Sequence, residues 1–247
     1  MPAWYVISLR PRGQHEPMRR AAARRGGGII ALSPWRLQAL DDEVARAGLR
    51  AALGAPRVLF TSPMAVRAAA LLQPLRPAED QQWFAVGAGT AAALRRAGAG
   101  DVAAPRRMDS EGLLALPGLQ RLDGIAVGLV TAPGGRGTLA PALQERGGEV
   151  RRADVYRRIP LPPSARALAA LRGLSRPAAV ALSSSDGLQR VMDALPADLA
   201  ARVRSLPVVG ASDRLLELAS TLGFTQGFRA SDARPASLVE TAASILG

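Results

Sequence analysis

Apolar runs short enough to be strands alternate along the whole chain with amphipathic segments of helical length. The apolar runs contain few polar residues, as strands do when a parallel sheet is covered on both faces. This alternation predicts an α/β protein with parallel sheets. Strands are expected at Tyr5–Leu9, Ile29–Leu32, Val58–Thr61, Trp83–Val86, Val102–Ala104, Ile125–Thr131, Val150–Tyr156, Ala178–Leu182, Pro207–Val209 and Gln226–Phe228, and helices at Gln14–Arg25, Ala88–Ala97, Gly137–Arg146, Ser212–Leu222 and Pro235–Leu246.

The pattern repeats itself about 120 residues further along. The stretch Val58–Ser62 recurs as Val180–Ser184, and Trp35 occupies the place that Tyr156 takes in the second copy. Two like-folded halves that face one another would form a cleft, and clefts between domains are favoured ligand sites. Positions where the copies differ in chemistry are therefore candidates for function.

Two segments have the composition of connectors, Ser33–Ala39 and Arg157–Ser164, and both follow the second strand of a copy. The duplication alone would allow a simple division into residues 1–122 and 123–247. The matched connectors instead favour a hinge that the chain crosses twice. The expected domains are residues 1–35 plus 163–247, and residues 36–162 with a hinge segment at each end.

Composition excludes several kinds of chemistry. The chain has no Cys, and its 32 basic side chains are all Arg because no Lys occurs. Thiol nucleophiles, thiolate metal sites, Schiff-base lysines and phosphate-loop lysines are therefore excluded. The single histidine, His15, cannot form a zinc site alone, and no metal site is expected. His15 stands at the expected start of a helix, where we predict a solvated imidazole.

The net charge of +12 would suit nucleic acid, but the arginines are scattered and aromatic residues make up only 4% of the chain. A polycarboxylate small molecule explains the same charge, since Arg binds carboxylates through two hydrogen bonds. An Arg-rich proteome is the plainer explanation of part of the excess. No stretch has the length and apolarity of a membrane span or the form of a leader peptide, so a cytoplasmic protein without nucleic-acid or membrane partners is expected.

Small and hydroxylated residues cluster where strands end and helices begin. The clusters are Thr61-Ser62, Gly87–Thr90, Ser183–Ser185 and Gly210–Ser212. In parallel α/β sheets ligands bind at the carboxyl ends of strands, where helix N-termini attract anions. Helix capping alone would also explain each cluster. A glycine turn with Arg136 follows another strand but lacks the Lys of a phosphate loop, so a plain turn with a solvated arginine is the alternative.

A series of short segments occurs in a characteristic order: Val58–Val66, Val86–Thr90 with Leu94 and Gly98, Pro105, Ser110–Leu114, Gly134–Arg136 with Leu139 and Leu143, Val155–Arg158 and Ser183-Ser184. In this order the segments resemble the uroporphyrinogen-III synthase family. The resemblance covers nearly the whole chain, although Leu9 stands where the family often has Thr.

The resemblance implies two flavodoxin-like domains joined by a two-stranded hinge. It implies a monomeric, cofactor-free lyase that closes the linear tetrapyrrole hydroxymethylbilane, with loss of water and inversion of ring D. The preceding pathway enzyme would be a transient partner. Tyr156 matches the tyrosine expected to help the substrate hydroxyl leave, and packing in the hinge is the alternative role. The candidate substrate-binding residues are Arg10, Thr61, Ser62, Gly87, Thr90, Ser110, Arg136, Ser183, Ser184, Gly210 and Ser212.

Two other functions share the duplicated architecture. A non-catalytic bilobal protein could bind an anionic metabolite without turnover. A nucleotide-sugar transferase would need an acidic pair or a histidine suited to it, and the sequence shows neither. Turnover of hydroxymethylbilane to isomer III distinguishes the three.

Overall fold

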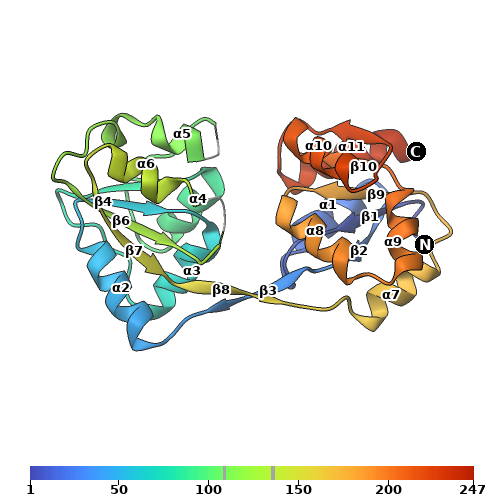
Figure 1. Ribbon diagram of the computed structural model, residues 1–247, viewed down its shortest axis with the longest axis horizontal. Helices are drawn as coiled ribbons and strands as arrows, with labels where there is room; N and C mark the ends of the chain where they lie inside the picture. Colours follow the sequence, from blue (N-terminus) through green and yellow to red (C-terminus); the bar gives the residue numbers. More distant parts are fainter. Residues whose placement is uncertain (108–109, 135–136) are drawn as a thin grey trace. The chain divides into compact units, whose positions relative to one another are not determined.

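The computed structural model describes residues 1–107, 110–134 and 137–247. Its contacts divide the chain into two compact units (Figure 1). Unit 1 contains both chain ends, Met1–Arg36 and Ile159–Gly247, and unit 2 is the continuous segment Leu37–Arg158. None of the helices in the described ranges is long and apolar enough to cross a membrane.

Unit 1 is built on a five-stranded parallel sheet whose central strands come from opposite ends of the sequence. Its order is β11-β10-β9-β1-β2, so that the N-terminal strand β1 pairs on one side with β2 and on the other with β9. Tyr5 in β1 lies opposite both Gly28 and Ala178. The strands are β1 (Tyr5–Ser8), β2 (Gly28–Ala31), β9 (Ala178–Leu182), β10 (Val208–Gly210) and β11 (Gly227–Arg229).

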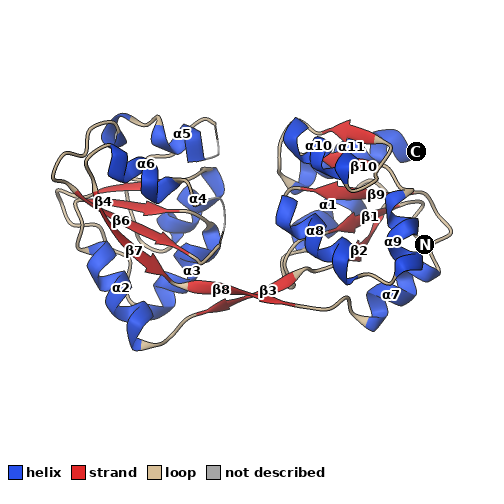
Figure 2. Cartoon of the chain, viewed as in Figure 1, coloured by secondary structure: helices blue, strands red, loops and turns tan. Residues whose placement is uncertain are grey.

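Helices cover both faces of this sheet, as the near-continuous apolar strands require (Figure 2). One face packs against four helices around Ile7, Val180 and Leu182, and the other packs against two helices around Val6 and Val209. The four are α7 (Ala165–Arg172), α8 (Ser185–Ala194), α9 (Ala197–Arg204) and α10 (Asp213–Thr221), and the two are α1 (Glu16–Ala23) and α11 (Pro235–Leu246).

Unit 2 repeats the three-layer arrangement on a four-stranded parallel sheet of order β5-β4-β6-β7. Phe60 and Val130 face three helices, and Leu59 and Leu129 face two α-helices and a 3₁₀ turn. The strands are β4 (Arg57–Phe60), β5 (Gln82–Ala85), β6 (Ala126–Thr131) and β7 (Glu149–Asp154). The first face carries α2 (Glu43–Leu53), α3 (Pro63–Leu72) and α4 (Ala88–Arg96), and the second carries α5 (Ser110–Leu114), η1 (Pro117–Leu119) and α6 (Leu139–Glu145).

Helix α2 approaches strand β6 closely at one glycine. A β-carbon on Gly128 would overlap the carbonyl oxygen of Ala52 in α2. The backbone fixes the position of the β-carbon, and the Ala52 carbonyl is itself part of the backbone. No side-chain rotation could therefore relieve the overlap. A glycine is therefore required at this point of the sheet.

Two further strands form a separate two-stranded ladder, β3 (Trp35–Ala39) with β8 (Tyr156–Pro160). The amide of Leu161 donates to Pro34, and the amide of Leu40 donates to Val155. The two strands therefore run in opposite directions. Trp35 and Tyr156 each occupy the first position of a strand, and the predicted class of two parallel-sheet domains with a two-stranded hinge is confirmed.

Two predicted strands differ from the structure. Residues 102–104 form only an isolated bridge, between Ala103 and Phe84, rather than a strand. The expected strand Val150–Tyr156 is interrupted, because β7 ends at Asp154 and the chain then leaves the sheet to begin β8 at Tyr156.

Candidate functional site

In unit 2 a pair of threonines closes the carboxyl edge of the sheet. Thr61 directly follows β4, and its hydroxyl donates to the Thr131 hydroxyl at 2.9 Å. Its amide donates to the Val130 carbonyl at 3.2 Å. Sequence analysis identified Thr61 but missed Thr131. The pairing of Phe60 with Val130 contained the signal, since the next residue of each strand must lie at the same edge.

Beside this pair lies the candidate catalytic residue. Ser62 is the N-cap of α3, and its hydroxyl accepts from the Ala65 amide at 3.0 Å. The same oxygen lies 3.2 Å from the phenol oxygen of Tyr156, and either group can be the donor. The Tyr156 side chain is only 6% exposed and packs in the cluster that contains Phe60 and Val155. Apolar packing therefore fixes the ring, and Ser62 fixes its hydroxyl.

The second candidate cluster at this edge of unit 2 follows β5, which pairs with β4 in parallel. Gly87 caps α4 in an extended conformation, and its carbonyl accepts from the Thr90 and Ala91 amides. The Thr90 side chain is buried. Ser110 begins the short helix α5. Arg136 lies outside the described residues.

The corresponding edge in unit 1 follows β9 and β10. Ser184 caps α8, where its hydroxyl accepts from the Gly187 amide at 3.4 Å, and Ser183 beside it is exposed. Ser212 is the N-cap of α10 but makes no side-chain cap bond. Gly210 ends β10, where a β-carbon would overlap the side chain of Leu216. That glycine has a packing role.

Arg10 lies at the same edge of unit 1, two residues beyond Ser8. Its Nε donates to the Gln14 carbonyl at 3.1 Å, and the side chain is half-buried. Burial lowers the pKa of the Arg10 guanidinium, because water solvates the charge incompletely there. Within the described ranges no carboxylate forms an ion pair with it. An anion bound here would replace the missing solvation.

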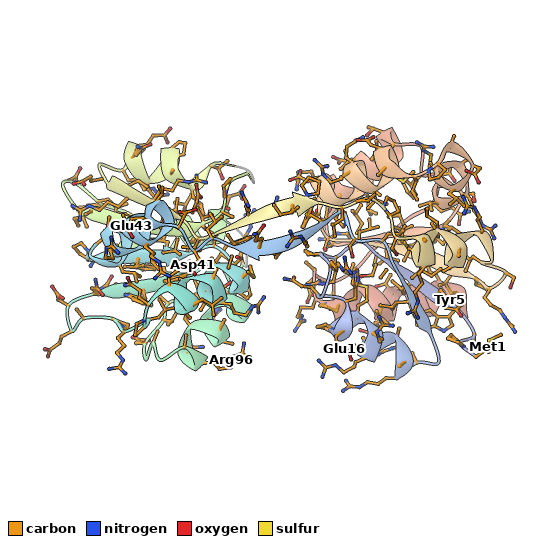
Figure 3. The ribbon with its side chains drawn as sticks, turned by 90° about the horizontal axis from the view of Figure 1, so that it is seen from below. Met1, Tyr5, Glu16, Asp41, Glu43 and Arg96 are labelled. Atoms are coloured by element: carbon orange, nitrogen blue, oxygen red, sulfur yellow. The ribbon has the colours of Figure 1, made fainter. Side chains whose placement is uncertain are left out.

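His15 is buried, so the prediction of a solvated imidazole is wrong. The side chain is 8% exposed, with Nδ1 2.9 Å from the Ser8 hydroxyl and Nε2 2.8 Å from the Ser33 hydroxyl. Burial lowers the pKa of His15 to about 4, and the charges of Arg19 and Arg10 add to the effect. Figure 3 labels Glu16, the next residue and the first of α1. The helix start was expected, but the two serine partners were not.

The structure therefore brings together some of the predicted residues in unit 2, and in unit 1 it places Arg10, Ser183, Ser184, Gly210 and Ser212 beyond or at the strand ends of one sheet. In unit 2 it joins Ser62 to Tyr156 and adds Thr131 to Thr61. No group of three or more acidic or histidine side chains suited to a metal ion occurs in the part of the chain that the structure describes. The polar groups at these edges are hydroxyls, backbone amides and arginine, a set suited to an anionic organic ligand.

A family model and two solved structures are similar to this chain. The family model for uroporphyrinogen-III synthase HemD matches residues 16–240. Two solved structures are similar: a mutant uroporphyrinogen III synthase from Thermus thermophilus (20% identity, TM-score 0.62, covering 96% of each chain) and uroporphyrinogen-III synthetase from Helicobacter pylori (13% identity, TM-score 0.61, covering 99% of this chain and 100% of the other). At these identities the structures show a common fold.

Proposed function

Because this chain belongs to the uroporphyrinogen-III synthase family, we propose that Tyr156, positioned by Ser62, assists the departure of the substrate hydroxyl. The enzyme is a lyase of porphyrin biosynthesis that cyclises hydroxymethylbilane to uroporphyrinogen III. The observation that carries the proposal is the 3.2 Å contact between the two hydroxyl oxygens at a helix N-terminus.

Catalysis is needed above all for the cleavage of one bond. The carbon–oxygen bond of the hydroxymethyl group breaks, and the hydroxyl leaves as water together with the N–H proton of its pyrrole ring. The azafulvene that results is electron-poor, and the substituted carbon of ring D forms the new carbon–carbon bond with it. That bond leaves the ring D carbon attached to two methylene groups, so its older bond, to the methylene of ring C, breaks. The same methylene then bonds to the free α-carbon of ring D, and this exchange inverts the ring. The free α-carbon loses its proton, which replaces the pyrrole N–H proton given up in the first step, so that water is the only other product.

A phenol suits the first step as a hydrogen-bond donor. A tyrosine hydroxyl is a hydrogen-bond donor, and the Tyr156 hydroxyl can donate its proton toward the departing oxygen. Ser62 already accepts from the Ala65 amide, so its own hydrogen can point to the phenol oxygen. That arrangement would leave the Tyr156 proton available to the substrate.

The remaining groups are proposed to bind the substrate carboxylates. Thr61, Ser183 and Ser184 stand at strand ends where helix N-termini present amides, and Thr90 lies in the first turn of α4. Arg10 adds a full positive charge. Gly87, Ser110, Gly210, Ser212 and Arg136 remain candidates for the same role. Several shared contacts would each contribute modestly, at about 1 kcal/mol for a neutral hydroxyl.

Replacing Tyr156 with Phe tests the catalytic role, because it removes the hydroxyl and keeps the ring in the cluster that contains Phe60 and Val155. We expect kcat to fall by about 10²-fold, the scale of a positioned acid, with KM little changed. Because the free bilane closes by itself to isomer I, the ratio of isomer III to isomer I should fall as well. Product isomers resolved by chromatography give this ratio directly.

Trp35→Phe is the matched control, since Trp35 begins the other hinge strand. Trp35→Phe should lower the free energy of unfolding while leaving kcat near the wild-type value. Full rate and isomer purity in Tyr156→Phe would show that the phenol only packs, and that catalysis here is mainly orientation of the substrate.

We also propose that the protein acts as a monomer in the cytoplasm and receives the bilane from the enzyme that makes it, without nucleic acid or membrane. The spontaneous closure of the free bilane supports direct transfer, since a long free lifetime would yield isomer I. Sedimentation of the protein alone and with the preceding enzyme measures both associations.

A further inference from the structure

In unit 1 three hydrogen-bonded side chains connect three elements at the carboxyl edge of the sheet. Ser8 ends β1, His15 occupies the N-cap position of α1 without a side-chain capping bond, and Ser33 follows β2 by two residues. The imidazole bridges the two hydroxyls at 2.9 and 2.8 Å. Neither serine was among the candidate residues, and the proposed catalytic step does not use the histidine.

The buried hydroxyl of Ser8 determines which groups donate in the hydrogen bonds between Ser8, His15 and Ser33. Ser8 is fully buried, and among the described residues His15 Nδ1 is the hydrogen-bond partner of its hydroxyl. If Nδ1 carried a proton and donated it, the Ser8 proton would stay unpaired, which is unfavourable in a buried place. Ser8 therefore donates to Nδ1, and the ring proton is on Nε2, from which it is donated to Ser33.

Ser33 then keeps its own proton for another partner. Its hydroxyl accepts from Nε2, has no further hydrogen-bond partner among the described residues, and belongs to a half-buried residue. The Arg10 guanidinium donates to the Gln14 carbonyl beside His15, and the Arg12 amide donates to the Trp35 carbonyl at 2.9 Å. The segment that contains Arg10 therefore lies along the segment that contains Ser33. One directed hydroxyl proton and one incompletely solvated cation are the two donors that a carboxylate binds well.

We infer that Ser33 and Arg10 bind one carboxylate of the substrate, and that His15 is the positioning residue that directs the Ser33 hydroxyl toward it. The inference rests on the proposed function, in which this edge of unit 1 binds the polycarboxylate. The neutral ring is essential, because a doubly protonated imidazole would have to donate to both serines and would strand the Ser8 proton.

Steady-state kinetics with hydroxymethylbilane tests the carboxylate site. Ser33→Ala should raise KM about tenfold and leave kcat within about twofold, the effect of a lost hydrogen bond to a charged group. Ser205→Ala is the control: Ser205 lies at the end of α9, where its hydroxyl donates to the Arg202 carbonyl, and its KM should not change. Circular dichroism of each variant verifies the fold. An unchanged KM for Ser33→Ala overturns the inference.

Two substitutions of His15 separate positioning from packing. Asn can reproduce the Nδ1 contact with Ser8, and it is a good N-cap for α1, but it is too short to reach Ser33. Gln extends to the Nε2 position and can donate to Ser33. His15→Asn should therefore raise KM about tenfold as Ser33→Ala does, and His15→Gln should restore KM to within about threefold of the wild type. Equal KM values in these two variants would show a merely structural histidine.

A double variant identifies the shared ligand. If Arg10 and Ser33 bind the same carboxylate, Arg10→Gln with Ser33→Ala should raise KM by clearly less than the product of the two single effects. Independent effects would assign them to different groups and overturn the paired site. Tyr156→Phe in the same assay distinguishes failure of the catalytic proposal from failure of the carboxylate site. The catalytic role of Tyr156 is tested by the kcat and the isomer ratio of that variant, whereas the carboxylate site is tested by the KM values of the Ser33, His15 and Arg10 variants.

Discussion

At the residue scale, the burial of His15 makes unit 1 sensitive to acid. The pKa of the imidazole is about 4 in the folded protein against 6.5 for an ordinary histidine, so both states are neutral above about pH 6.5. As the pH falls from 6.5 toward 4, the unfolded chain binds a proton that the folded protein does not. The free energy of unfolding should therefore decrease by roughly 2 kcal/mol between pH 7 and pH 5.

Urea unfolding at these two pH values measures the loss. The matched variant His15→Gln has no titrating group in this window, and it should be less stable at pH 7 but nearly flat down to pH 5. The two proteins share every other titrating group, so the difference between their slopes reports His15 alone. The same slope in both proteins would mean that His15 is solvated after all.

Single residues were the hardest part to predict from sequence. The pattern placed Tyr156 and Ser62 at element ends, where the structure joins them, because strand ends and caps are local signals. The burial of His15 depends on Ser8 and Ser33, which reach it from two strands. Local sequence around a histidine contains no sign of such partners, and exposure statistics pointed the wrong way.

At the scale of elements, the contact between α2 and β6 depends on a missing side chain. Gly128→Ala would place a methyl group on the Ala52 carbonyl and force the helix away from the sheet. We expect a loss of about 1–3 kcal/mol from the free energy of unfolding of unit 2, the scale of overpacking that moves backbone. Thermal unfolding followed by circular dichroism measures it.

Gly100→Ala is the control for that substitution. Gly100 is exposed, and a β-carbon there would meet nothing within 4 Å. Gly100→Ala should change the free energy of unfolding by no more than about 0.5 kcal/mol. A similar small effect for Gly128→Ala would show that α2 can shift freely on the sheet.

Elements were predicted well where apolar runs were long and less well at the hinge. Ala178–Leu182 was expected and occurs with the same bounds. The run from Val150 to Tyr156 was predicted as one strand, because hydrophobic pattern does not show that Asp154 ends one sheet and Tyr156 begins another. Such a change of partner is decided by tertiary pairing.

At the scale of the whole molecule, the division into units predicts how fragments behave. Residues 38–158 contain all four strands of one sheet and the helices on both faces, and should fold alone. Residues 1–122 contain β1 and β2 without β9, and lack β6 and β7, so no complete sheet can form. Urea unfolding of the isolated fragments checks this, and a cooperative transition for 1–122 would contradict it.

Sequence analysis detected the two halves because their strand ends repeat with nearly constant spacing. The duplication could not by itself say which strands share a sheet. Only the position of the connectors favoured a double crossing, and pairing of β1 with β9 across most of the chain was beyond any local pattern. Long-range pairing leaves no periodic trace in sequence.

The central place of β1 sets an order of events during synthesis. A ribosome releases β1, α1 and β2 first, but the strand that must lie beside β1 emerges only with Ala178–Leu182. Unit 2 is released in full before that strand appears. One edge of β1 in the nascent chain therefore stays unpaired while unit 2 folds. Open strand edges recruit other chains, so chaperone demand on this protein should fall mainly in that interval.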